Sequence, residues 1–208
     1  MVEFMKLVVE EQSSLTVEMR NLLSVAYKNV VGAKRASWRI LSSLTMREER
    51  DNGNVVQQEI CAEYMRKVED ELTAVCRDVL ALLEDKLIGK TSADSDGQAA
   101  AVEAEVFYLK MAGDYYRYIA EISKEKGDDC QAAKDAVEKY DQATEMAKKN
   151  DTDGLKSTHP IRLGLALNFS VFYVRDAAGG RVFAHVPVPF SCLLPYRVPR
   201  PALLKEPL

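Results

Sequence analysis

The chain has 208 residues, of which 47% are hydrophobic, and this is enough apolar material to bury a core. Its 28 Lys and Arg residues against 32 Asp and Glu residues give a net charge of −4, which excludes a general positive field for nucleic acid or an anionic membrane. Any anion-binding site must therefore be local.

Apolar residues at three- and four-residue steps predict long amphipathic helices through most of the chain. The spacing is clearest at Ile60, Tyr64, Val68, Leu72 and Val75. Polar, turn-forming segments separate the periodic stretches and mark the helix ends. We expect six helices, over residues 2–12, 16–48, 54–88, 98–123, 128–149 and 160–174. Sustained strand-like alternation does not occur, so the fold class predicted is an antiparallel all-α array.

Two helix starts carry local signals. Thr16 is a suitable N-cap for the second helix, because its hydroxyl oxygen can accept a hydrogen bond from a free backbone N–H group. Thr158 is a cap-type residue just before His159 and Pro160, and proline fits the first turn of a helix. The sixth helix is therefore expected to begin near residue 160.

Proline divides the chain in two. All seven prolines lie at or after Pro160, and six of them fall between Pro187 and Pro207. Proline removes a backbone donor and breaks helices and central strands. We therefore expect a helical domain over residues 1–174 and an irregular, proline-rich C-terminal tail over residues 175–208.

The sequence gives little indication of a membrane span, a signal peptide or a disulfide framework. No run approaches the roughly 18 apolar residues of a membrane span, and charged residues such as Glu3 and Lys6 make the amino terminus unlike a signal peptide. The four cysteines are scattered without a C-x-x-C pair, which favours reduced thiols over disulfides or a zinc site. They are Cys61, Cys76, Cys130 and Cys192. These patterns predict an intracellular protein.

Three cations share one stripe of the second predicted helix. Lys28, Arg35 and Arg39 are seven and then four residues apart, so they fall within about 40° of one another around the helix axis. A solvated basic face is one interpretation. The other is an anion-binding surface, because like charges at this spacing disfavour a helix unless an anion compensates them.

The fourth predicted helix carries a second charged stripe, made of Lys110, Asp114, Arg117, Tyr118 and Glu121. An ordinary ladder of ion pairs between successive turns would have this spacing. Alternatively, the two acids hold Arg117 extended, so that its guanidinium fork can bind a dianion beside the Tyr118 hydroxyl. Spacing alone leaves both interpretations open.

Asn168 interrupts the apolar sixth helix, where a buried amide needs a hydrogen-bonding partner. It is either a satisfied core asparagine or an amide that holds the main chain of an extended peptide.

Sequence motifs for catalysis are scarce, because the chain has only two histidines and no Gly-rich phosphate loop, H-E-x-x-H or G-x-S-x-G motif. We therefore expect no enzyme activity, no catalytic residue, no cofactor and no metal site.

Three blocks of sequence carry a specific resemblance. They are RNLLSVAYKNV with GAKRASWR at residues 20–30 and 32–39, VFYLKM with GDYYRY at 106–111 and 113–118, and THPIRLGLALNFSVFY at 158–173. On these blocks the chain is identified as a plant-like member of the 14-3-3 family, with similarity over about residues 2–173. The resemblance implies an all-α fold of the 14-3-3 type.

The resemblance also implies a function. Members are non-enzymatic adaptors that bind phosphoserine or phosphothreonine peptides, act as dimers, and regulate client proteins in signalling in the cytoplasm and nucleus. By alignment, the phosphate-binding set is Lys28, Arg35, Arg117 and Tyr118, and Asn168 holds the peptide backbone. Lys110 lines the groove, and its apolar wall includes Val25, Leu167 and Val171. A role with transcription-factor complexes would run through protein partners, without direct binding to nucleic acid or membrane.

Departures from the family pattern set further expectations. The family's first helix and last two helices have no counterpart, so homodimers or heterodimers should be weakened or lost. Ala112 stands at a groove lysine position, and Arg175 at a groove glutamate position. Two alternatives to a phosphopeptide adaptor therefore remain. One is a degenerate copy or misread gene model with little phosphopeptide binding, and the other is a generic helical scaffold for unphosphorylated partners.

Overall fold

The computed structural model describes residues 1–12, 14–50, 55–90, 97–123, 130–148 and 154–179, and these ranges contain helices and no strand. The helices of the described residues are α1 (Val2–Glu11), α2 (Val17–Arg50), α3 (Val55–Leu82), α4 (Gln98–Ile122), α5 (Gln131–Lys148) and α6 (Pro160–Gly179). A short π-helical turn, η1 (Leu83–Leu87), follows α3 directly. The predicted all-α fold class is confirmed.

Two helix ends differ from the prediction by five residues or more, and the other bounds differ by at most three. The helix expected over residues 54–88 widens at its end into η1, where the Ile88 N–H donates to the Leu83 carbonyl at 2.8 Å, five residues back. The last helix continues to Gly179 instead of ending at residue 174. The first residues of the predicted tail are therefore helical, and residues 180–208 lie outside the described part of the chain, so the division into domain and tail stays a prediction.

The helix starts follow local hydrogen bonds. Thr16 Oγ1 accepts from the Met19 N–H at 3.3 Å, which confirms Thr16 as the N-terminal cap of α2. At α6 the cap comes from His159, whose Nδ1 accepts from the Ile161 N–H at 3.3 Å. Pro160 occupies the first helical position, as expected, because no intrahelical donor is needed there.

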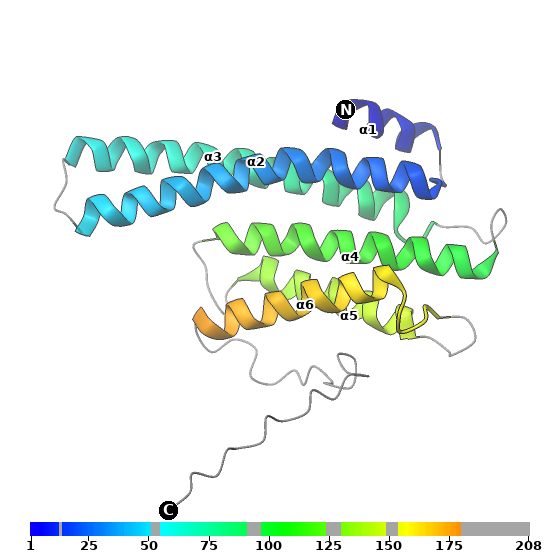
Figure 1. The fold of residues 1–208 in the computed structure, drawn as a ribbon. Coiled ribbons are helices and arrows are strands. Elements are labelled where there is room, and N and C mark those ends of the chain that lie inside the picture. The colour runs from blue at the N-terminus through cyan, green and yellow to red at the C-terminus, as the bar shows by residue number, and fades with distance from the viewer. Residues whose placement is uncertain (13, 51–54, 91–96, 124–129, 149–153, 180–208) are drawn as a thin grey trace, which may run out of the picture.

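The helices form an antiparallel array in which α4 lies at the centre (Figure 1). On one side of α4 lie the α2 and α3 pair and the short α1. On the other side lie α5 and α6. Two apolar clusters result, one centred on Leu23, Tyr27 and Leu72, the other on Tyr140 and Phe172. Since α4 contributes to both clusters, it joins the two halves of the array.

The three described cysteines, Cys61, Cys76 and Cys130, are free thiols. Burial raises the pKa of the Cys76 thiol to about 12, so this side chain stays protonated at neutral pH and acts as an apolar core residue. In the part of the chain that the structure describes, no helix is long and apolar enough to cross a bilayer.

The helices α4 and α5 pack closely at Gly113. A Cβ atom at this position would lie 2.8 Å from Cδ1 and Cε1 of Tyr140, which is nearer than real Cβ contacts come. Tyr140 is fully buried, so its ring has little room to retreat. The glycine is therefore needed for close approach of the two helices, although glycine in a helix costs about 1 kcal/mol relative to alanine.

Gly113→Ala is expected to lower the free energy of unfolding by about 1–2 kcal/mol, because overpacking of roughly 1–3 kcal/mol exceeds the gain in helix propensity. Gly32→Ala is the matched control. Its added Cβ meets no atom within 4 Å, so only the propensity gain remains and the chain should become more stable by about 0.5–1 kcal/mol. Urea unfolding followed by circular dichroism measures both changes. Equal effects at the two glycines would contradict the packing argument.

Candidate functional site

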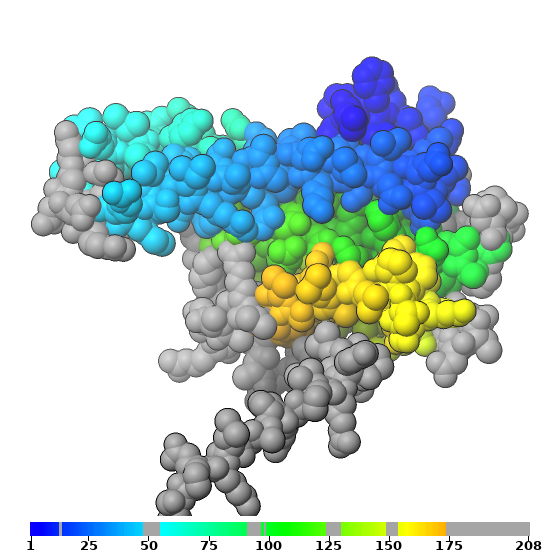
Figure 2. Space-filling model, in the orientation of Figure 1, coloured from blue at the N-terminus to red at the C-terminus, as the bar shows by residue number. Residues whose placement is uncertain are grey.

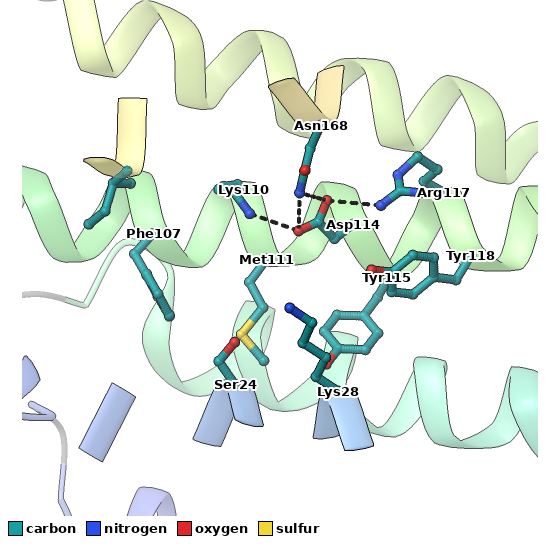
Figure 3. Close-up of a pocket in the computed structure, with 11 residues that line it drawn as sticks. Ser24, Lys28, Phe107, Lys110, Met111, Asp114, Tyr115, Arg117, Tyr118 and Asn168 are labelled. Atoms are coloured by element: carbon teal, nitrogen blue, oxygen red, sulfur yellow. Dashed lines mark hydrogen bonds and ion pairs between the residues drawn. The ribbon is translucent and has the colours of Figure 1, made fainter. Parts of the chain in front are cut away.

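Side chains from α2, α4 and α6 line an open cavity of about 240 Å³ (Figure 3). Space-filling atoms show the α4 surface exposed between α2 and α6 (Figure 2). The polar lining residues are Ser24, Lys28, Lys110, Asp114, Tyr115, Arg117, Tyr118 and Asn168, and the apolar ones are Phe107, Met111 and Ile161. A second cavity of about 400 Å³ shares Lys28 and Tyr118 and includes Arg35. The two predicted charged stripes therefore face the same region.

Asp114 is the centre of the polar contacts in the first cavity (Figure 3). Its carboxylate accepts hydrogen bonds from Lys110 Nζ at 2.9 Å and from Asn168 Nδ2 at 2.7 and 2.9 Å, and Arg117 Nη2 lies 3.4 Å away. Burial alone would raise the pKa of Asp114, but the positive charges of Lys110 and Arg117 outweigh it and lower the pKa. The carboxylate is therefore ionised at neutral pH.

These contacts bear on two of the open interpretations. Lys110 and Asp114 do form the ordinary ion pair between successive turns, and Asp114 also contacts Arg117 as the alternative required. The Asn168 amide nitrogen is satisfied by Asp114, as a core asparagine would be. Its side-chain oxygen is a separate hydrogen-bond acceptor, so the same residue can still meet a donor in the cavity.

The Tyr118 ring contacts two guanidinium groups from different helices. The ring centroid lies 3.9 Å from Cζ of Arg35 on α2 and 4.6 Å from Cζ of Arg117 on α4. Burial raises the pKa of Tyr118, and the nearby Asp114 charge adds to this, against the lowering effect of the two arginines. The hydroxyl therefore keeps its proton at neutral pH and remains a hydrogen-bond donor.

Glu121 holds both arginines of the α2 stripe. Its Oε2 accepts from Arg35 Nη2 at 2.5 Å, and its Oε1 accepts from Arg39 Nη2 at 2.9 Å. The Glu121 side chain is only 3% exposed, while Arg35 is 18% and Arg39 57% exposed. The stripe is therefore not a uniformly solvated face, because Arg35 is part of a partly buried ion pair. The sequence-based hypothesis paired Glu121 with Arg117 and did not predict these two partners on α2.

Lys28 is the exposed cation of the site. It lines both cavities, and Figure 3 shows its side chain reaching from α2 toward α4. Among the described residues it forms no ion pair, in contrast to Lys110, Arg35 and Arg117. Its ammonium group is therefore available to an incoming anion. We define Lys28, Arg35, Arg117 and Tyr118 as the cationic site.

The predicted apolar wall is exposed but lies outside both cavities as the described residues line them. Val25 on α2 and Leu167 and Val171 on α6 are solvent-exposed neighbours of the lining residues Ser24 and Asn168. Ala112 is fully buried in the core, so this alanine contributes packing and does not face the cavity. The side chain of Arg175 lies outside the described part of the structure.

Sequence reasoning missed several contributors to the site. Ser24, Phe107, Met111 and Ile161 line the first cavity although no motif marks them individually as ligand contacts. Their only signal is position, since each lies within a few residues of a predicted site residue on the same helix. Within the described residues no cluster of side chains has the composition of a metal site.

The fold and the site together define an all-helical protein with a cationic recess between three helices, in a chain whose net charge is negative. The family model described as "14-3-3 protein" matches residues 1–178. The chain belongs to the 14-3-3 family, a family of non-enzymatic adaptor proteins, and the resemblance seen in the three sequence blocks is confirmed.

Curated relatives are about half identical to the chain. The "Checkpoint signal transducer rad24" of Schizosaccharomyces pombe is 53% identical over 174 residues, covering 83% of this chain and 59% of the relative. The "14-3-3-like protein GF14 iota" of Arabidopsis thaliana is 51% identical over 173 residues, with the same two shares. The "14-3-3 protein homolog" of Neospora caninum is 52% identical over 180 residues, covering 83% of this chain and 62% of the relative. The chain thus spans about 60% of the length of these relatives.

Proposed function

We propose that the chain is a phosphoserine- and phosphothreonine-dependent adaptor that binds client proteins through the cationic site. One observation carries this proposal: Lys28 and Arg35 on α2 and Arg117 and Tyr118 on α4 line two cavities that share Lys28 and Tyr118, with the Tyr118 ring against both guanidiniums. Planar guanidinium forks match phosphate oxygens, and a phosphate near −2 is the anion that three cations would best compensate.

Each group has a distinct part in the proposed binding. Arg35 and Arg117 donate charge-assisted hydrogen bonds, each worth about 1.5–3 kcal/mol net. Lys28 supplies an exposed ammonium group, and the protonated Tyr118 hydroxyl donates a further bond. Lys110 stays paired with Asp114 and contributes positive potential at the cavity wall.

The client's main chain is expected to run past Asn168. Because the Asn168 amide nitrogen donates to Asp114, its side-chain oxygen is the atom that would accept a peptide N–H. Residues flanking the phosphate would contact Leu167, Val171 and Val25, which are exposed apolar side chains on α6 and α2. In this proposal, binding to the chain regulates client proteins in signalling, in the cytoplasm and nucleus. Some of these clients would belong to transcription-factor complexes, which the chain would reach through protein partners.

The test compares one peptide in two forms. Fluorescence anisotropy with a labelled phosphoserine peptide and its unphosphorylated twin should give at least about tenfold tighter binding of the phosphorylated form, the difference that one charge-assisted bond supplies. Treatment of the complex with a phosphatase should release the peptide. Equal affinity for the two forms would reject the proposal in favour of a scaffold for unphosphorylated partners, and no binding of either would favour a degenerate copy.

A further inference from the structure

Tyr140 on α5 connects to two charged groups on α4 without lining either cavity. Its hydroxyl donates to Asp114 Oδ1 at 2.5 Å and accepts from Arg117 Nε at 3.2 Å. The side chain is fully buried, and burial raises the pKa of the phenol, so the hydroxyl is protonated and can play both parts. Tyr140 can influence an anion only through Arg117 and Asp114.

These contacts use one edge of the Arg117 guanidinium. Nε and Nη2 lie on the same side of the planar group, and they face Tyr140 Oη and Asp114 Oδ1 respectively. A planar guanidinium with one edge engaged can present its other edge, which carries Nη1, to a ligand. The orientation of the fork is thereby set before a ligand arrives, and less rotamer entropy is lost on binding.

The position of Tyr140 is itself fixed by its surroundings. Its ring lies directly on the α4 backbone at Gly113, one residue before Asp114. Phe169 and Phe172 of α6 pack against the ring, with centroids 5.1 and 6.2 Å away. The hydroxyl oxygen is therefore held in a constant place relative to residues 114 and 117 of the same helix.

We propose that Tyr140 is a positioning residue that orients the Arg117 guanidinium for anion binding. The proposal rests on the function proposed above for the cationic site, and it adds a residue of α5 to a site otherwise built from α2, α4 and α6. It also gives the Gly113 contact a role, because any larger residue there would displace the phenol that holds Arg117.

The first experiment needs no ligand. In the full chain labelled with ¹⁵N, the Arg117 Nε–H signal is assigned by its loss in Arg117→Lys, and its hydrogen-exchange rate is measured. Tyr140→Phe keeps the ring and removes the acceptor, so exchange should become at least about tenfold faster. Tyr116→Phe is the control, since it removes a hydroxyl that donates to Glu84 at 3.2 Å and lines neither cavity. An unchanged rate in Tyr140→Phe overturns the proposal, whether or not the chain binds phosphopeptides.

The second experiment is a double-mutant cycle on phosphopeptide affinity. Tyr140→Phe should weaken binding about tenfold while Tyr116→Phe leaves it unchanged. If Tyr140 acts through the Arg117 fork, adding Tyr140→Phe to Arg117→Lys should weaken binding by less than about twofold further. Fully additive losses would show a general structural effect and overturn the proposal. Equal affinity of the parent chain for both peptide forms would instead reject the proposed function, and the exchange measurement would still decide the role of Tyr140.

Discussion

Arg117→Ala and Arg35→Ala are each expected to abolish the preference for a phosphorylated peptide, with a loss of affinity of roughly a hundredfold or more. Each change removes a guanidinium that would make two charge-assisted hydrogen bonds to a phosphate, worth about 1.5–3 kcal/mol each. Fluorescence anisotropy with the paired peptides measures the loss. Arg117→Lys should also weaken binding, because an ammonium group cannot reproduce the bidentate fork.

Neither alanine variant should unfold the chain. After Arg35→Ala, Glu121 keeps its contact with Arg39, and after Arg117→Ala, Asp114 keeps Lys110 and Asn168. No buried carboxylate is left without a partner, so helicity by circular dichroism should change little. Arg39→Ala is the matched control, since Arg39 is on the same stripe but is more exposed than Arg35 and lies outside the cationic site. A loss as large for Arg39→Ala as for Arg35→Ala would contradict the assignment.

The second large effect is alkaline unfolding. Burial is the main cause that raises the pKa of seven tyrosines, Tyr27, Tyr108, Tyr115, Tyr116, Tyr118, Tyr140 and Tyr173. The unfolded chain ionises its tyrosines near pH 10, whereas the folded chain holds Tyr108 protonated up to about 12. The stabilising contribution is therefore complete below about pH 10 and is lost as the pH rises toward the folded value.

For Tyr108 alone, this loss is on the order of 2–3 kcal/mol between those two pH values, a large share of the stability of a typical domain. We expect cooperative unfolding between about pH 10 and 12, with circular dichroism and tyrosinate absorbance changing together. Tyr108→Phe should shift the midpoint upward relative to the parent, and Tyr64→Phe, at an exposed position, should not. Gradual tyrosinate formation with helicity retained would contradict the prediction.

Most helix bounds were predicted to within three residues from the sequence, because the apolar period is long. Because no proline precedes residue 160, the breaks between helices could be read from the polar, turn-forming segments, and the cap at Thr16 marked the start of α2. The π-helical turn was not predicted, because it depends on hydrogen bonding between residues five apart, as from the Ile88 N–H to the Leu83 carbonyl, and not on the apolar pattern. The continuation of α6 to Gly179 was missed because the chain beyond Tyr173 loses its apolar period.

The candidate site was predicted only in part. Spacing placed each charged stripe on one helix, but it could not show that Arg35 of α2 and Arg117 of α4 would meet across Tyr118. Helical spacing predicted Arg117 as the partner of Glu121, whereas tertiary packing pairs Glu121 with Arg35 and Arg39 of α2. Tyr140 was missed because a tyrosine on the apolar face of a helix is indistinguishable from ordinary core until its neighbours in space are known.

The paired state of the arginines has a consequence for ligand choice. Asp114 and Glu121 already occupy part of the guanidinium surface and stay bound there, so a phosphate bound as proposed would contact the remaining guanidinium N–H groups against the repulsion of these two carboxylates. The charge of the incoming anion therefore decides whether it binds beside these two carboxylates. A glutamate side chain on a client would offer a single charge, much as Glu121 does, whereas a phosphate offers nearly two charges and three acceptor oxygens. The resident acids would thus make the recess discriminate against acidic residues that imitate phosphorylation.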